Sequence, residues 1–277
     1  SASVEAAIKG AGAVVHGAGF VSRDKADRPQ MMRVHVNGTR VVTQAAVDAG
    51  VRRVVHISTS GVNAVGDDPE LVHHEDDPVN IELISRFPYY LSKWLAERAA
   101  DDVVARARAG GAEVELVTLN PSLVLGPGDK RGSSTEDVER FLNREIPMVP
   151  PGGVSFVDAR DVADAVVSAL EKGRHGERYL LGALNLTFEQ FFERLSEVSG
   201  VSGPWIPVSV PGKLSRFSVG LLERVADAVG AKAPVKEIEA DMASRFWYVD
   251  ARKAQAELGF EPRDPMATLL DTVRDLR

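Results

Sequence analysis

Short runs of apolar, often β-branched residues alternate along the chain with longer stretches in which apolar residues recur every three or four positions. The short runs predict buried strands at residues 13–16, 53–60, 114–119, 154–157 and 178–181. The amphipathic stretches predict helices at residues 3–10, 29–49, 89–109, 158–170 and 187–200. Alternation at these lengths is typical of right-handed βαβ units, so the pattern predicts an α/β fold with a parallel sheet.

Signals at the ends of these stretches support the assignment. Gly50 and Gly110 follow helices at positions where glycine commonly ends a helix, and Asp158 precedes a helix as a cap. Thr187 and Gln190 have the spacing of a capping box. From about residue 202 to 244 the alternation stops, and Pro and Gly interrupt a mostly helical pattern. This region predicts a small lobe beside the sheet.

Composition and charge exclude several classes of protein. The formal charge of −7 offers no basic surface for phosphate backbones, so we expect no nucleic-acid partner. The chain has no cysteine, and its six histidines lack ligand spacing, so we expect neither disulfides nor a metal site. No apolar run reaches the roughly 18–20 residues of a membrane span. We therefore expect a cytoplasmic protein with no membrane partner.

Candidate chemistry gathers at the ends of the predicted strands. His16, Gly17 and Ala18 follow the first strand, and Ser58, Thr59 and Ser60 end the second. Asn120, Pro121 and Ser122 follow the third strand, and Tyr89 and Lys93 open the helix that precedes it. The carboxyl ends of parallel strands share one edge of a sheet, where ligands bind. The pattern therefore brings these side chains to one site.

Tyr89 and Lys93 stand four residues apart and share a helix face. A free tyrosine has a pKa of about 10, and a lysine ammonium one turn away favours the phenolate and lowers that pKa. A Ser or Thr hydroxyl at the strand end can hold a substrate oxygen against the phenol. The set suits proton transfer, although the same spacing also occurs at the start of an ordinary amphipathic helix.

Motifs in a fixed order resemble the extended short-chain dehydrogenase/reductase family, in its dihydroflavonol-reductase-like and 3β-hydroxysteroid-dehydrogenase-like branch. They are HVNGTRVVTQAAVDAGVRRVV (35–55), VVHISTS (54–60), PYYLSK (88–93), LNPSLVLGPGD (119–129), VSFVDARDVADAVVSAL (154–170) and DARKAQAELGFEP (250–262). Each motif alone is weak, but the ordered set spans residues 3–277. The resemblance implies a Rossmann-type, doubly wound domain over 1–150, a segment returning to its sheet over 151–185, and a mainly substrate-binding, mostly helical lobe over 186–277.

The resemblance also implies catalytic roles. Tyr89 is expected to be the general acid/base, and Lys93 to bind the nicotinamide ribose and lower the pKa of Tyr89. Thr59 is expected to hold the substrate oxygen, with Ser60 as its rival. The residues implied along the cofactor, which is NAD or NADP, are His16, Gly17, Ala18, Asn37, Ser58, Lys93, Pro121 and Ser122.

One part of the family pattern is missing. The glycine-rich turn that holds the pyrophosphate follows a first strand, whereas Gly10 and Gly12 precede a strand here. Gly17 and Gly19 follow a strand, but Ser22 stands where the third glycine belongs. By the family's layout, roughly 50–60 residues, with two strands and their helices, are expected upstream. The strand at 13–16 is therefore expected to be a sheet edge.

The resemblance predicts an NAD(P)-dependent oxidoreductase that interconverts an alcohol and a carbonyl on a small molecule. Two alternatives stay open: a nucleotide-sugar epimerase or dehydratase, and a non-catalytic binding protein that has lost its nucleotide site. The helices at 29–49 and 89–109 predict a homodimer, with outward faces containing Val41, Ala45, Ala99 and Val103.

Overall fold

A parallel sheet forms the first half of the protein in the computed structural model, which describes residues 2–146, 148–203 and 237–277. Its order is β1-β2-β3-β6, with bounds β1 (Ala13–His16), β2 (Arg53–Ile57), β3 (Glu115–Pro121) and β6 (Arg178–Leu181). All three pairings are parallel. Among the described strands β1 pairs with β2 alone, which confirms that it is an edge.

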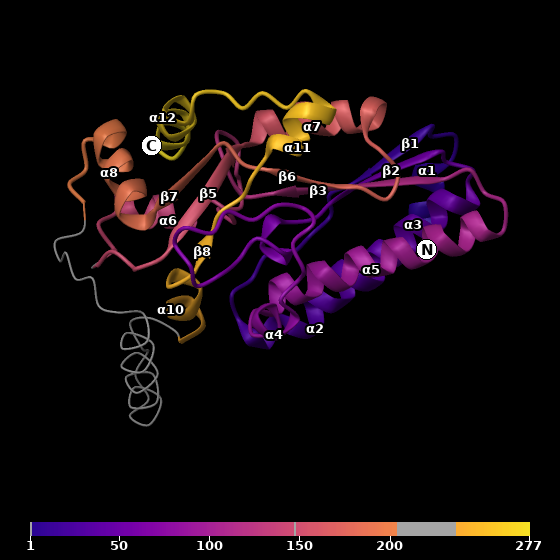
Figure 1. The fold of residues 1–277 in the computed structure, drawn as a ribbon, viewed down its shortest axis with the longest axis horizontal. Coiled ribbons are helices and arrows are strands. Elements are labelled where there is room, and N and C mark those ends of the chain that lie inside the picture. The colour runs from indigo at the N-terminus through magenta and orange to yellow at the C-terminus, as the bar shows by residue number, and fades with distance from the viewer. Residues whose placement is uncertain (1, 147, 204–236) are drawn as a thin grey trace.

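Helices cover both faces of this sheet, which is why consecutive residues in the middle of its strands, such as Val54 and Val55, are apolar and buried. On one face lie α1 (Ala2–Ile8), α3 (Gly38–Asp48) and α5 (Pro88–Ala109), packed with Val54 and Leu116. On the other lie α7 (Ala159–Lys172) and α11 (Arg252–Leu258), packed with Val55 and Val117. Figure 1 shows the two helical layers with the strands between them.

The helix predicted at 29–49 consists of several segments. A short 3-10 helix, η1 (Lys25–Asp27), leads into α2 (Arg28–Met31), a π-helical segment η2 (Met32–Asn37), and then α3. A π turn inserts an extra residue into the helical period, so the residues on the buried face shift along the sequence. Through this segment the buried side chains Met31, His35 and Thr39 follow one another at four-residue spacing.

A second sheet carries the other half of the protein. It contains β4 (Leu123–Leu125), β5 (Gly153–Asp158) and β7 (Leu184–Thr187) in that order, with β8 (Phe246–Trp247) also paired to β5. Its core is lined by Phe141, Phe156 and Phe192, among others. The helices of this part are α6 (Glu136–Leu142), α8 (Phe188–Ser199), α10 (Glu237–Ala243) and α12 (Pro265–Asp275).

The segment 151–185 divides between the two sheets instead of returning to the first as a whole. Its strand β5 pairs with β4, β7 and β8, whereas β6 pairs with β3. Strands β3 and β6 leave the first sheet at the same level. They stay paired up to Pro121 and Leu181, and the segments that follow them form β4 and β7 of the second sheet. The capping box at Thr187 and the cap at Asp158 are confirmed. Most of the lobe predicted at 202–244 lies outside the described residues.

The proposed outward faces of α3 and α5 need a correction. Ala45, Ala99 and Val103 are buried within this chain, and only Val41, at 38% exposure, faces outward. The cause is that α3 and α5 pack against each other, while α1 packs on α3. In the part of the chain that the structure describes, no helix is both long and apolar enough to span a membrane.

Candidate active site

The start of α5 is fastened to the end of β2. Pro88 occupies the first turn of the helix, where its missing N–H costs nothing, and Tyr89 and Lys93 follow one turn apart. The buried Lys93 ammonium donates a hydrogen bond of 2.6 Å to the carbonyl oxygen of Ile57, the last residue of β2. The catalytic candidates on the helix and the hydroxyls after the strand therefore lie at the same sheet edge.

Three hydroxyl residues follow β2 and differ in accessibility. Ser58 and Ser60 are buried, whereas Thr59 between them is half-buried in extended backbone. Ser60 begins a 3-10 turn, η3 (Ser60–Val62), that includes Gly61. A Cβ atom on Gly61 would lie 2.3 Å from the ring of Tyr90, so the close packing of this turn on α5 requires glycine there. Thr59 is thus the more accessible of the two hydroxyls considered for the substrate.

Three buried histidines surround Lys93. The rings of His16 and His56, which are register partners on β1 and β2, stack with centroids 5.4 Å apart. His16 Nε2 also lies 2.9 Å from the hydroxyl of Thr39. Burial and the neighbouring Lys93 lower the pKa of His16 to about 4, and they hold the pKa of His56 well below its usual range. The group is therefore neutral at pH 7.

His35 is the residue that the sequence analysis missed. Its Nε2 accepts a hydrogen bond of 2.9 Å from the Phe20 amide, which leaves the proton on Nδ1, 2.8 Å from the Ser92 hydroxyl. That hydroxyl donates to the carbonyl of Tyr89 over 2.7 Å. The imidazole ring also meets the Tyr89 ring edge-on, with centroids 5.7 Å apart. Burial lowers the pKa of His35 to about 4.

The structure brings His35, and not Asn37, to this site. Asn37 is exposed at the end of the π segment, while Met31, His35 and Thr39 are buried at four-residue intervals. That interval was visible in the sequence and is the signal that could have found His35. Gly17 and Ala18 lie exposed in the loop after β1.

The charge states of the pair differ from those that the spacing suggests. Burial raises the pKa of Tyr89 to about 12 and lowers the pKa of Lys93 to about 8, with Glu97 opposing the second shift. The Lys93 ammonium is hydrogen-bonded to the Ile57 carbonyl, and the raised pKa of Tyr89 is caused by burial. Near pH 7 the site therefore holds a neutral phenol beside an ammonium group.

Polar atoms at the strand ends fit the nicotinamide half of a dinucleotide. The hydroxyls of Ser58 and Ser122 are buried and have no hydrogen-bond partner among the described residues. Pro121 is buried beside Ser122, and Lys93 is bonded to the end of β2 at the same edge. These groups suit a ribose and a carboxamide. No described strand is followed by a glycine-rich turn that opens a helix, so the fit concerns this half alone.

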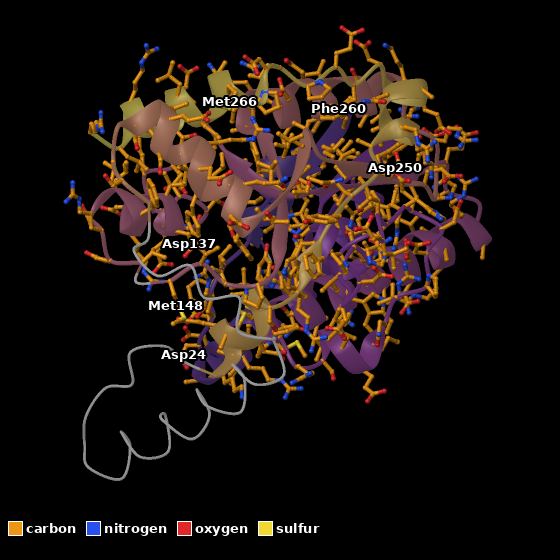
Figure 2. The ribbon with its side chains drawn as sticks, turned by 60° about the vertical axis from the view of Figure 1, so that its left-hand side comes forward. Asp24, Asp137, Met148, Asp250, Phe260 and Met266 are labelled. Atoms are coloured by element: carbon orange, nitrogen blue, oxygen red, sulfur yellow. The ribbon has the colours of Figure 1, made fainter. Side chains whose placement is uncertain are left out.

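The loop after β1 is joined to helix α6 by an ion pair. The Arg23 guanidinium binds the Asp137 carboxylate through two hydrogen bonds, of 2.7 and 3.1 Å. Figure 2 shows Asp24 and Asp137 on the same side of the molecule. This charge-assisted pair joins the first sheet's loop to the second part of the chain.

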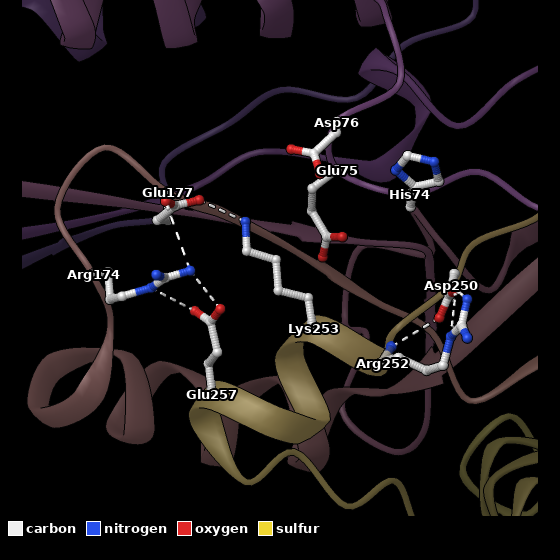
Figure 3. Close-up of a pocket in the computed structure, with 9 residues that line it drawn as sticks. All are labelled: His74, Glu75, Asp76, Arg174, Glu177, Asp250, Arg252, Lys253 and Glu257. Carbon is white, nitrogen blue, oxygen red and sulfur yellow. Dashed lines mark hydrogen bonds and ion pairs between the residues drawn. The ribbon is translucent and has the colours of Figure 1, made fainter.

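A cavity of about 540 Å³ lies elsewhere, at the outer edge of β6 (Figure 3). None of the catalytic candidates lines it. Its cations are held by carboxylates, as in the pairs Lys253–Glu177 and Arg252–Asp250. Glu75 accepts a hydrogen bond from the Leu180 amide of β6 and so satisfies a group at the strand edge. The cavity is lined by His74, Glu75, Asp76, Arg174, Glu177, Asp250, Arg252, Lys253 and Glu257.

No cluster suited to a metal ion is found among the described residues.

Comparison with known proteins identifies the family. A family model described as the NAD dependent epimerase/dehydratase family matches residues 1–182. The chain belongs to this family. It is 30% identical over 272 residues to a protein named putative dihydroflavonol 4-reductase from Synechocystis sp., covering 96% of this chain and 76% of the relative. It is 34% identical over 186 residues to cinnamoyl-CoA reductase 1 of Oryza sativa subsp. japonica, covering 65% of this chain and 52% of that protein.

Two solved structures agree with the fold. One, described as gox2253, superimposes with a TM-score of 0.80 at 26% identity, over 99% of this chain and 80% of the other. A dTDP-glucose 4,6-dehydratase from Streptomyces venezuelae, solved with NAD bound, gives a TM-score of 0.70 at 22% identity, over 99% of this chain and 75% of that one. The second likeness shows the fold alone. The chain spans about half to four fifths of the length of these relatives. As a family member, it has the Rossmann-type fold that the motifs predicted and a nicotinamide dinucleotide as its cofactor.

Proposed function

We propose that the protein is an NAD(P)-dependent oxidoreductase that interconverts an alcohol and a carbonyl on a small organic molecule, with Tyr89 as general acid/base. The observation that carries the proposal is the meeting of three groups at one sheet edge. Tyr89 and Lys93 open α5, Lys93 is bonded to the end of β2, and Thr59 follows two residues later. A scaffold has no physical need for that combination in one place.

In the direction of reduction, the neutral phenol of Tyr89 donates its proton to the carbonyl oxygen of the substrate. The Thr59 hydroxyl holds that oxygen, and the Lys93 ammonium stabilises the phenolate that is left. Lys93, Ser58, Pro121 and Ser122 would hold the nicotinamide and its ribose. The bound cofactor supplies the hydride in this direction and accepts it in the other. His35 and Ser92 keep the Tyr89 ring and backbone in place.

Two observations favour a reductase over a nucleotide-sugar epimerase of the same family. Thr118 and Leu119 stand before Asn120, where epimerases commonly carry Arg and Tyr. The relatives of 30% identity or more include proteins named as dihydroflavonol and cinnamoyl-CoA reductases. The epimerase remains the second candidate because the family model includes epimerases and dehydratases.

The proposal extends to assembly and location. We propose that the protein forms a homodimer through the helical layer of α3 and α5, with Val41 in the contact. We also propose that it is a cytoplasmic enzyme that uses the cellular nicotinamide pool. The exposed position of Val41 on α3 supports the first part.

The proposed activity is tested on the full-length polypeptide. NADH and NADPH are titrated by fluorescence, and turnover is then followed at 340 nm with a panel of small aldehydes, ketones and alcohols. We expect saturable binding of at least one cofactor and turnover of at least one carbonyl–alcohol pair. Binding of neither cofactor would overturn the proposal in favour of a non-catalytic protein. Conversion of a nucleotide sugar with no net change in cofactor absorbance would favour the epimerase.

A further inference from the structure

Glu97 continues the line of catalytic candidates along α5. It stands four residues after Lys93, as Lys93 stands four after Tyr89, so the three side chains share one helix face. Glu97 is only 2% exposed. A carboxylate is costly to bury unless it is paired and hydrogen-bonded, so its partners are expected to be specific.

Both oxygen atoms of Glu97 have a partner. Asn120, at the end of β3, donates from Nδ2 to Glu97 Oε1 over 2.9 Å. Arg178, the first residue of β6, donates from Nη2 to Oε2 over 2.9 Å. The carboxylate therefore ties α5 to two neighbouring strands of the sheet.

Asn120 connects this carboxylate to the substrate end of the site. Its Nδ2 donates a second hydrogen bond, of 3.0 Å, to the carbonyl oxygen of Thr59. Both neighbours of Nδ2 are acceptors only, so the orientation of the amide is fixed. Asn120 is fully buried, and it links Glu97 on the helix with Thr59 after β2.

Glu97 also acts electrostatically on Lys93, which stands one helical turn before it on the same face of α5. The titratable groups around Lys93 are His16, His35 and His56, which are already neutral where Lys93 titrates, and Glu97, whose carboxylate favours the ammonium form. The charged groups that act around Glu97 itself are Lys93, Arg178 and Asp101. Glu97 is thus the carboxylate that acts on Lys93 from its own helix face.

We infer that Glu97 is a positioning residue of the proposed oxidoreductase: through Asn120 it fixes Thr59 relative to Tyr89, and through its charge it keeps Lys93 protonated. The inference rests on the proposed function and adds two separable roles. One is geometric, because a displacement of about 1 Å between reacting groups can cost about 100-fold in rate. The other is electrostatic, because an opposite charge nearby favours the ammonium form.

The test compares Glu97→Gln and Glu97→Asp in the full-length polypeptide, with kcat, KM and the pH profile measured between pH 6 and 10. Glu97→Gln removes the charge, so Lys93 loses its proton at a lower pH. We expect kcat to fall about tenfold or more and the alkaline limb, near the Lys93 pKa of about 8, to move down by about one pH unit. Glu97→Asp keeps the charge but shortens the reach, so kcat falls while the limb stays in place.

The matched control is Glu177→Gln. It also removes a paired carboxylate, because Glu177 forms an ion pair with Lys253 beside the cavity in Figure 3, away from Lys93. It is expected to leave kcat and the pH profile unchanged. A kcat within twofold of the parent in both Glu97 variants, with the same pH profile, would overturn the inference. If Tyr89→Phe still abolishes turnover in that case, the proposed function stands and only the role of Glu97 fails. If Glu97→Gln does not fold, the kcat and pH limb of Glu97→Asp decide alone.

Discussion

At the scale of single residues, the site is dominated by burial. Burial raises the pKa of Tyr89 to about 12 and lowers that of Lys93 to about 8, so near pH 7 both groups carry their protons. A protonated phenol beside an ammonium suits proton donation to a carbonyl better than proton removal from an alcohol. The resting site is therefore set for reduction, and oxidation is expected to be favoured as pH rises.

The buried histidines predict a loss of stability in mild acid. The pKa values of His16 and His35 fall from 6.5 to about 4 on folding, and that of His56 also falls. Between these values the unfolded chain therefore binds protons that the folded chain does not bind. Above pH 6.5 protonation of these histidines does not lower the free energy of unfolding. As pH falls from 6.5 toward 4, that free energy declines by about 1.4 kcal/mol per pH unit for each imidazole. Urea unfolding at pH 7, 6 and 5 measures this slope.

His56→Leu tests the assignment of that slope. Both ring nitrogens of His56 are buried without a partner among the described residues, so leucine loses no hydrogen bond there. The variant is expected to show a shallower slope and a higher free energy of unfolding at pH 5. The same urea series at pH 7, 6 and 5 compares the slope of the variant with that of the parent. An equal slope in His56→Leu and the parent would contradict this explanation.

At the scale of elements, the contact of the η3 turn with α5 holds the two halves of the site together. Gly61→Ala places a Cβ atom 2.3 Å from the Tyr90 ring, next to Tyr89. Overpacking of this kind costs about 1–3 kcal/mol, and the displaced helix start should also lower turnover. Gly12→Ala is the control because its Cβ atom meets nothing within 4 Å. Thermal unfolding and kcat measure both effects, and equal values for the two variants would refute the role given to this contact.

The elements also show what the sequence pattern can and cannot predict. The strands at 13–16 and 178–181 and the start of α5 follow from apolar runs and Pro88, because burial and backbone restriction act locally. The break between the two sheets depends on pairing between distant residues, such as Pro121 with Leu181. The four-residue spacing of Met31, His35 and Thr39 could have shown that His35 is buried, but its hydrogen bonds with Phe20 and Ser92 depend on the fold.

At the scale of the whole molecule, the proposed dimer depends on the outer surface of α3. Val41 is exposed there, so Val41→Glu would bury a charge in the contact and shift the protein from dimer to monomer. Light scattering at micromolar concentration reports the mass of each form. Val167→Glu, on α7 at 58% exposure, is the matched control and should remain dimeric. A parent protein that is monomeric at that concentration would contradict the proposed assembly.

The central claim, that Tyr89 moves the proton in an NAD(P)-dependent reaction, is tested most directly by turnover of Tyr89→Phe. The account predicts a loss of at least about 100-fold in kcat, the scale of a positioned general acid/base, with the fold intact by circular dichroism. Tyr179→Phe also removes one hydroxyl, which binds Glu257 away from the site, and should keep near-normal turnover. A Tyr89→Phe enzyme that retains kcat within about threefold of the parent would contradict the account, since general acid/base catalysis contributes far more than that.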